Sequence, residues 1–212
     1  MAEIADARPF RALSWYSGQR SFPGWYWSST MGAHVTYDSR LELARLLLAD
    51  FDCSVEVIVA QPFQLVETIG SELRRHVPDF LLIRTDQTVT LVNVKTETAL
   101  EKAKVRTTFA WVEEVLSGRG WGHEVWTGGN PTFGENVRFL AGFRRMHYPV
   151  ALLEVLEREA PGGTFPEAEL AVGPRWDRRE ARAAILHLLW WHRLAADLDV
   201  PLSSRTVLEV PP

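Results

Sequence analysis

The stretch VPDFLLIRTDQTVTLVNVK, from Val77 to Lys95, holds two apolar runs separated by a short polar segment. The first run reads as a strand that Pro78 can begin, because proline is tolerated at the first residue of a strand. TDQT, from Thr85, is typical of a turn, and the β-branched run VTLVNVK favours a second strand. The stretch therefore predicts a β-hairpin.

The residues on either side predict further helices and strands around this hairpin. Before it, Ser39 to Ala49 has a helical pattern and Val55 to Val59 alternates like a strand. After it, Thr98 to Ser117 is helical in pattern, Gly118 is a plausible stop, and a short strand starts at His123. The predicted order is helix, strand, strand, strand, helix, strand, which indicates a mixed α/β fold with a central sheet.

The whole chain divides by pattern into three regions, 1–36, 37–130 and 132–212. The first is rich in aromatic residues, shows no sustained period, and has Gly24, Ser28 and Ser29 as turn markers. The last predicts helices over 136–146, 149–159, 165–171 and 177–194. Two short extended pieces then follow, around a Pro-Leu-Ser-Ser turn. Helices followed by a terminal hairpin are typical of a winged-helix domain.

Composition limits the class of protein. The 212 residues are 46% hydrophobic and 24% charged, as in an ordinary globular protein. The single cysteine, Cys53, excludes an intramolecular disulfide. We find neither a secretory signal nor an apolar run of about 20 residues, so we expect a cytoplasmic protein that does not cross a membrane. The net charge of −4 predicts weak unaided binding to DNA and recruitment by a partner.

The hairpin also carries the residues with chemical potential. Asn93 and Lys95 share one face of their strand because side chains alternate, and Asp79 lies on the neighbouring strand. Glu42, on the first predicted helix, could add a second carboxylate. Carboxylates and a carbonyl oxygen suit Mg²⁺, which prefers hard oxygen ligands. Lys95 could orient or deprotonate the attacking water, or neutralise a pentavalent phosphorane.

These residues, in this order, resemble the PD-(D/E)xK nuclease superfamily. More narrowly, the chain looks like the TnsA-type endonuclease subunit of heteromeric bacterial transposases. The resemblance covers nearly the whole chain and rests on GQRSFPG, Ser39-Arg40-Leu41-Glu42, Gln61-Pro62, His76-Val77-Pro78-Asp79-Phe80, Val92-Asn93-Val94-Lys95 and the closing PLSSRTVLEV.

The resemblance implies a restriction-endonuclease-like αβββαβ core with a carboxy-terminal winged-helix domain. It implies a metal-dependent endonuclease that cuts one strand of double-stranded DNA at transposon ends. Its partners would be a companion transposase or integrase subunit and an AAA+ ATPase regulator, and its cofactor Mg²⁺, with Mn²⁺ as a substitute. Site residues follow by position: Glu42, Asp79 and Lys95 as the catalytic triad, and Glu42, Asp79, Asn93 and the Val94 carbonyl as metal ligands. Most of the superfamily has an acidic residue where this chain has Asn93, whereas the TnsA-like branch commonly has an amide.

Several residues allow other interpretations. Gln61 and His76 are candidates for residues that contact and orient the metal ligands without binding the metal. Arg20 and Trp25 are candidates for binding DNA, although such an aromatic segment more often packs over a sheet. Glu42 follows Ser39 by three residues, so it could simply complete a capping box at the start of the helix.

Two other functions also remain open. The same core could serve as a nuclease in a restriction or phage-defence system. Alternatively, the chain could be a non-catalytic DNA-binding or adaptor module, and Asn93 is the residue that keeps this reading open, because its amide brings no formal negative charge to a metal.

Overall fold

The computed structural model describes residue 10 and residues 22–69 and 71–212. The chain forms two compact units, Met1–Gly128 and Gly129–Pro212. No helix among the described residues is long and apolar enough to cross a membrane. Each unit has its own buried core, so each is described by itself.

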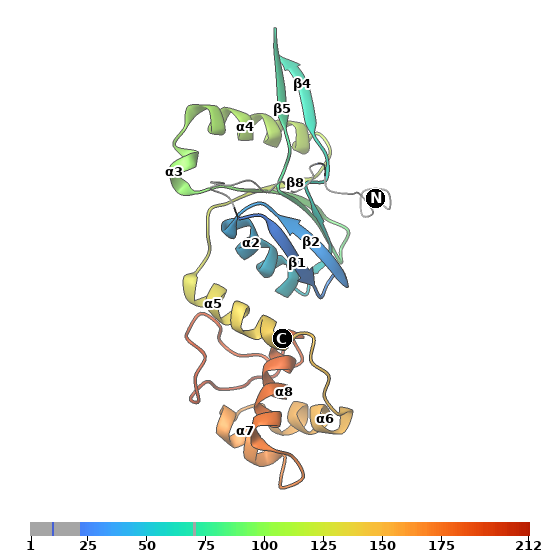
Figure 1. Ribbon diagram of the computed structural model, residues 1–212, viewed down its shortest axis with the longest axis vertical. Helices are drawn as coiled ribbons and strands as arrows, with labels where there is room; N and C mark the ends of the chain where they lie inside the picture. The colour runs from blue at the N-terminus through green and yellow to red at the C-terminus, as the bar shows by residue number, and fades with distance from the viewer. Residues whose placement is uncertain (1–9, 11–21, 70) are drawn as a thin grey trace. The chain divides into compact units, whose positions relative to one another are not determined.

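A four-stranded mixed sheet forms the centre of the first unit (Figure 1). Its strands, in spatial order, are β3 (Val55–Ala60), β6 (Phe80–Arg84), β7 (Val89–Val94) and β8 (Gly122–Trp126). β6 is antiparallel to both β3 and β7, whereas β8 runs parallel to β7. β7 therefore has hydrogen-bonded neighbours on both sides, which fixes the residues at its end.

Helices pack against this sheet. α2 (Arg40–Phe51) packs against β3 and β7 and against the hairpin formed by β1 (Gly24–Ser28) and β2 (Ala33–Tyr37). The short α3 (Glu97–Leu100) precedes α4 (Ala103–Ser117), which carries Trp111, Val112 and Leu116 into a core formed with strand residues such as Leu81 and Leu91. This core is apolar, so burial of hydrophobic surface is its main stabilising force.

A second hairpin interrupts the predicted order of elements. β4 (Leu65–Ile69) and β5 (Glu72–His76) pair only with each other and extend past the central sheet (Figure 1). The order of elements predicted from the sequence has no strand between β3 and β6. The polar, charged residues of β5 hide the strand pattern, because most of this hairpin has no buried face. His76 ends β5 and lies three residues before Asp79.

The prediction of turns at Gly24 and Ser28 is wrong, because both residues lie in β1. The turn of this hairpin falls instead between Ser28 and Ala33, where Gly32 has a φ of 58° that suits glycine. Tyr26 and Ser28 point inward because the Asp50 carboxylate accepts hydrogen bonds from both of their hydroxyls. A buried acceptor on α2, which no local pattern reveals, therefore holds this hairpin.

The second unit contains four helices and a short 3₁₀ turn. These are α5 (Pro131–Leu140), η1 (Ala141–Phe143), α6 (Val150–Glu159), α7 (Phe165–Ala171) and α8 (Arg178–Trp190). α8 packs against the other three helices and buries Ala181, Ala184, Ile185, Leu188 and Leu189. The expected extended pieces form only isolated bridges, which pair Thr164 with Val207 and Ala195 with Glu209.

The mixed α/β class predicted from the sequence is confirmed, with a mixed sheet and several helices. The long helix predicted over 98–117 is two helices, because the chain turns at Glu101 and Lys102 between α3 and α4. The helix predicted over 136–146 begins earlier, at Pro131, where Asn130 accepts a hydrogen bond from the main-chain N–H of Thr132 and caps it.

Candidate active site

Glu42 lies in the first turn of α2 and is 8% exposed. The helix begins there because the Ser39 hydroxyl accepts a hydrogen bond from the main-chain N–H of Glu42. In return, the Glu42 carboxylate accepts hydrogen bonds from the Ser39 hydroxyl at 3.0 Å and from the main-chain N–H of Asp38 at 2.8 Å. Glu42 thus does take part in capping, as the alternative interpretation expected, although the main-chain N–H it binds is that of Asp38.

Asp79 and Lys95 meet where β6 begins and β7 ends. The Asp79 carboxylate oxygen Oδ2 accepts a hydrogen bond from the main-chain N–H of Val94 at 2.6 Å. Lys95 Nζ lies 3.4 Å from the same oxygen and donates to the Val94 carbonyl at 2.8 Å. The antiparallel pairing of β6 with β7 sets this geometry, and it matches the expectation that strand register brings the two residues together.

Glu42 lies close enough to Asp79 for the charge of Asp79 to act on it. Burial, and to a smaller extent the negative charge of Asp79, raise the pKa of Glu42 from its ordinary 4.5 to about 7. The hydrogen bonds from Asp38 and Ser39 oppose the shift. A buried carboxyl group with the negative charge of a second carboxylate nearby forms a place where a cation would be stabilised.

Asn93 is buried on β7, with no exposed surface. Its Oδ1 lies 2.6 Å from His76 Nε2, and its Nδ2 lies 2.8 Å from His123 Nε2. Both ends of the amide are therefore occupied by histidine rings. The prediction that Asn93 binds a metal would require Oδ1 to exchange its hydrogen bond with His76 for that metal.

The sequence analysis did not single out His123 or Glu113. His123 is on β8, and its Nδ1 lies 2.8 Å from a carboxylate oxygen of Glu113 on α4. The parallel register pairs Leu91 with His123, which brings the ring beside Asn93 two residues further along β7. The sequence of a parallel pair gives no local signal of its register, so nothing near His123 could have indicated this contact.

Gln61 supports the site from the end of β3. Its Nε2 donates to Asp38 at 2.8 Å, and its main-chain N–H donates to the carbonyl of Asp79 at 2.9 Å. Gln61 has a φ of 46°, a conformation that is uncommon for a residue with a side chain. These contacts connect the turn before α2 to the start of β6, and the supporting role of Gln61 in a metal site stays a prediction.

Of the two predicted DNA-binding residues, the structure describes Trp25 alone. Trp25 lies on β1 and is 64% exposed, so its ring is open to a partner. Arg20 lies outside the described residues.

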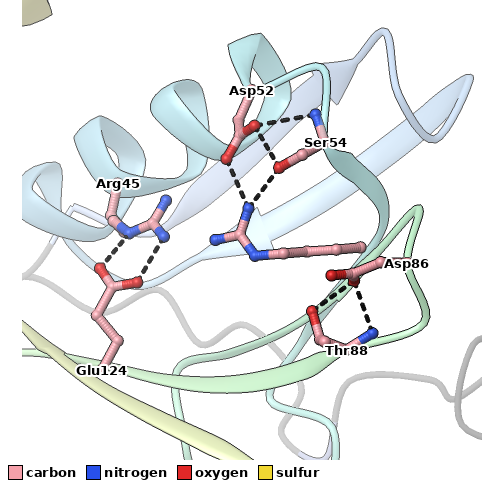
Figure 2. Close-up of polar contacts among 7 residues, drawn as sticks. Arg45, Asp52, Ser54, Asp86, Thr88 and Glu124 are labelled. Carbon is pink, nitrogen blue, oxygen red and sulfur yellow. Dashed lines mark hydrogen bonds and ion pairs between the residues drawn. The ribbon is translucent and has the colours of Figure 1, made fainter.

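An ion pair connects α2 to the edge strand of the sheet. The Arg45 guanidinium donates two hydrogen bonds of 2.7 Å to the Glu124 carboxylate on β8 (Figure 2). The Arg45 side chain is 10% exposed, so solvent screens this pair little. The pair holds the helix that carries Glu42 against the strand that carries His123.

The donor atoms at the corner suit a hard divalent cation. Glu42 and Asp79 supply carboxylate oxygens, Val94 supplies a main-chain carbonyl, and no described residue binds Asp79 Oδ1. No group of three or more His, Cys, Asp or Glu side chains that could hold a metal occurs in the described part of the chain. Oxygen donors of this kind, completed by water, fit Mg²⁺.

No model of a known protein family matches the sequence, and no curated protein matches it significantly.

Proposed function

We propose that this protein is a metal-dependent DNA endonuclease that hydrolyses one phosphodiester strand at a transposon end, as a TnsA-like subunit of a heteromeric transposase. The observation that carries the proposal is the meeting of Glu42, Asp79 and Lys95 from three separate segments of the chain. The order of α2, β3, β6, β7, α4 and β8 supports the nuclease-like core, with the β4–β5 hairpin as an insertion.

The residues divide the work of hydrolysis. Glu42, Asp79 and the Val94 carbonyl would hold Mg²⁺ or Mn²⁺, which when bound polarises the scissile phosphate and acidifies water. Lys95, fixed by Val94 and Asp79, presents a positive charge that offsets the charge developing on the phosphate oxygens. Water attacks phosphorus and gives up a proton to solvent, the bond to the leaving oxygen breaks, and that oxygen takes a proton from solvent. Asn93 is not needed as a ligand in this arrangement.

The second unit supports a winged-helix assignment. α6, the bridge at Thr164, α7, α8 and the bridges at Ala195 and Val207 follow in the order that such a domain requires. In the proposed complex this unit docks the companion transposase or the AAA+ ATPase. The net charge of −4 agrees with recruitment by a partner, since it gives little unaided attraction to DNA.

The test is DNA nicking by purified variants in Mg²⁺. We expect Asp79→Ala and Lys95→Ala each to lower the rate at least about 100-fold. Asp86→Ala is the matched control, because Asp86 belongs to the same β6–β7 hairpin but is exposed in its turn. Nicking that persists in both site variants would exclude this site.

The biological setting has a separate test. Genes for a DDE-type integrase and an AAA+ ATPase beside this one would favour transposition. If both genes are missing and a gene for a DNA-modification enzyme lies beside this one, a restriction or defence nuclease with the same site is favoured.

The occupied amide of Asn93 favours one further candidate, a non-catalytic adaptor. Titration with Mg²⁺ and Mn²⁺ distinguishes it. An adaptor would bind neither metal yet keep its partner, whereas the proposed nuclease binds at least one.

A further inference from the structure

A line of hydrogen bonds runs through the first unit from α4 to β5. Glu113 contacts His123 Nδ1 at 2.8 Å, His123 Nε2 contacts Asn93 Nδ2 at 2.8 Å, and Asn93 Oδ1 contacts His76 Nε2 at 2.6 Å. The ring of Phe109 lies between the two imidazoles, edge-on at 5.9 Å from His76 and 5.8 Å from His123. The middle of this line is buried, since the His123 side chain is 3% exposed.

The Glu113 carboxylate determines which atom donates and which accepts in each hydrogen bond of this line. An ionised carboxylate only accepts hydrogen bonds, so His123 Nδ1 must carry a proton. The NH₂ group of Asn93 can only donate, so His123 Nε2, which faces it, accepts that hydrogen bond through its lone pair. The Asn93 oxygen is left facing His76, whose Nε2 must donate. Each step follows from the one before it.

His76 is held at the edge of the proposed site. The charged or titratable groups that act on it are Asp79, Lys95 and His123. Burial lowers the pKa of His76 below its ordinary value, while its bond to Asn93 and the charge of Asp79 oppose that shift. With Nε2 protonated, neutral His76 has its lone pair on Nδ1, and no described residue hydrogen-bonds to that atom.

We infer that Asn93 is a positioning residue: Glu113, acting through His123, orients its amide, and the amide holds His76 in the Nε2-protonated form beside Asp79 and Lys95. An amide can donate to one histidine and accept from the other, whereas an ionised carboxylate can only accept. An aspartate in this place would leave His123 Nε2 without a donor. The catalytic importance of this line rests on the proposed endonuclease function, whereas the proton positions do not.

The proton positions are tested by ¹⁵N NMR of the histidine rings in the metal-free, full-length protein. His76→Gln and His123→Gln variants assign the two sets of signals. We expect His76 to be protonated on Nε2 and His123 on Nδ1. A neutral His123 protonated on Nε2 would overturn the inference, because the Asn93 amide would then have to face the other way.

The role of Asn93 is tested with Asn93→Asp by calorimetric titration with Mg²⁺ alone. This change introduces the acidic residue found in most of the nuclease superfamily. A positioning residue predicts affinity about tenfold weaker, since outer residues that orient a site commonly contribute that much. Tightening of about tenfold or more would overturn the inference and restore Asn93 as a metal ligand.

A milder variant covers the case in which Asn93→Asp fails to fold. Glu113→Gln keeps the size of a side chain that is 64% exposed, and Glu114→Gln, next to it on α4, is the matched control. We expect Glu113→Gln alone to change the His123 and His76 ring signals and to lower kcat about tenfold. Ring signals identical in the two variants would overturn the inference. Expected ring signals in a protein that never cuts DNA would instead count against the proposed function alone.

Discussion

Helices α2 and α8 both bury apolar side chains, but α2 buries charged side chains as well. α2 turns Glu42, Arg45 and Asp50 inward, and each of them is less than 9% exposed. α8 turns inward mainly alanine, leucine and isoleucine, and Ala181, Ile185 and Leu188 have no exposed surface. Apolar burial stabilises both helices, and α2 depends in addition on polar partners supplied by distant segments.

This difference means that α8 mainly stabilises the core of the second unit, whereas α2 also positions residues on other elements of the first unit. Buried charges cost free energy unless they are paired, so their presence on α2 indicates that they are kept for what they hold. Asp50 holds the β1–β2 hairpin, Arg45 holds β8, and Glu42 lies near Asp79. Five substitutions test the comparison.

Asp50→Ala should have the largest effect on stability. The Asp50 carboxylate accepts hydrogen bonds from the hydroxyls of Tyr26 and Ser28 and from the main-chain N–H groups of Ser29 and Thr30. Its removal leaves several donors without an acceptor, and we expect the free energy of unfolding to fall by about 4 kcal/mol. Urea denaturation measures this change. A loss below about 1 kcal/mol would mean that water replaces the carboxylate at no cost.

Leu188→Ala should follow, with a loss of about 3 kcal/mol. Leu188 is fully buried on α8, so truncation removes apolar contacts and leaves a cavity. Hydrogen exchange should show greater opening within 150–209 than in the central strands. Leu170→Ala, at an exposed position on α7, serves as the control and should change stability little.

Glu42→Gln should stabilise the metal-free protein. The folded-state pKa of Glu42, about 7, lies above its ordinary value of 4.5. Its stabilising contribution is therefore complete below the unfolded value and is lost as the pH rises through about 7. Near pH 8 the glutamine variant should be more stable than the wild type by about 2 kcal/mol, as judged by urea denaturation.

Excess Mg²⁺ should reverse this order, because the wild type would then gain a ligand-bound state. Equal stabilities near pH 8, with and without Mg²⁺, would argue that Glu42 is only a cap.

Arg193→Ala should have the smallest effect, below about 1 kcal/mol. Arg193 forms two hydrogen bonds with Glu157, as Arg45 does with Glu124, but its side chain is 41% exposed. Arg45→Ala is the matched change in a buried setting and should cost about 3 kcal/mol. Similar losses for the two variants, measured in low and high salt, would contradict the view that burial decides the value of such a pair.

The sequence predicted the parts of the fold that depend on local pattern. The β6–β7 hairpin follows from two apolar runs around a polar turn, and the Ser39 cap follows from one residue before an apolar helix. The proximity of Asp79 and Lys95 could be predicted because a short hairpin leaves few choices of register.

The remainder depended on contacts between distant residues. The β1–β2 hairpin is fixed by Asp50, more than 20 residues away in the chain, and the β4–β5 hairpin lacks the alternation of a half-buried strand. Asn93 was placed correctly on its strand, but its partners on β5 and β8 come from the tertiary fold. A side chain's face can be predicted from alternation, whereas the partner it meets there cannot.

The division of the chain at Gly128 has a consequence for evolution. Glu42, Asp79 and Lys95, and the line of contacts that ends at Glu113, all belong to the first unit. Recombination at the Gly128–Gly129 junction could therefore exchange the second unit without changing any of these contacts. One ancestral first unit could in this way be paired with different carboxy-terminal units. Under the proposed function, such lineages would differ in their partners and share one reaction.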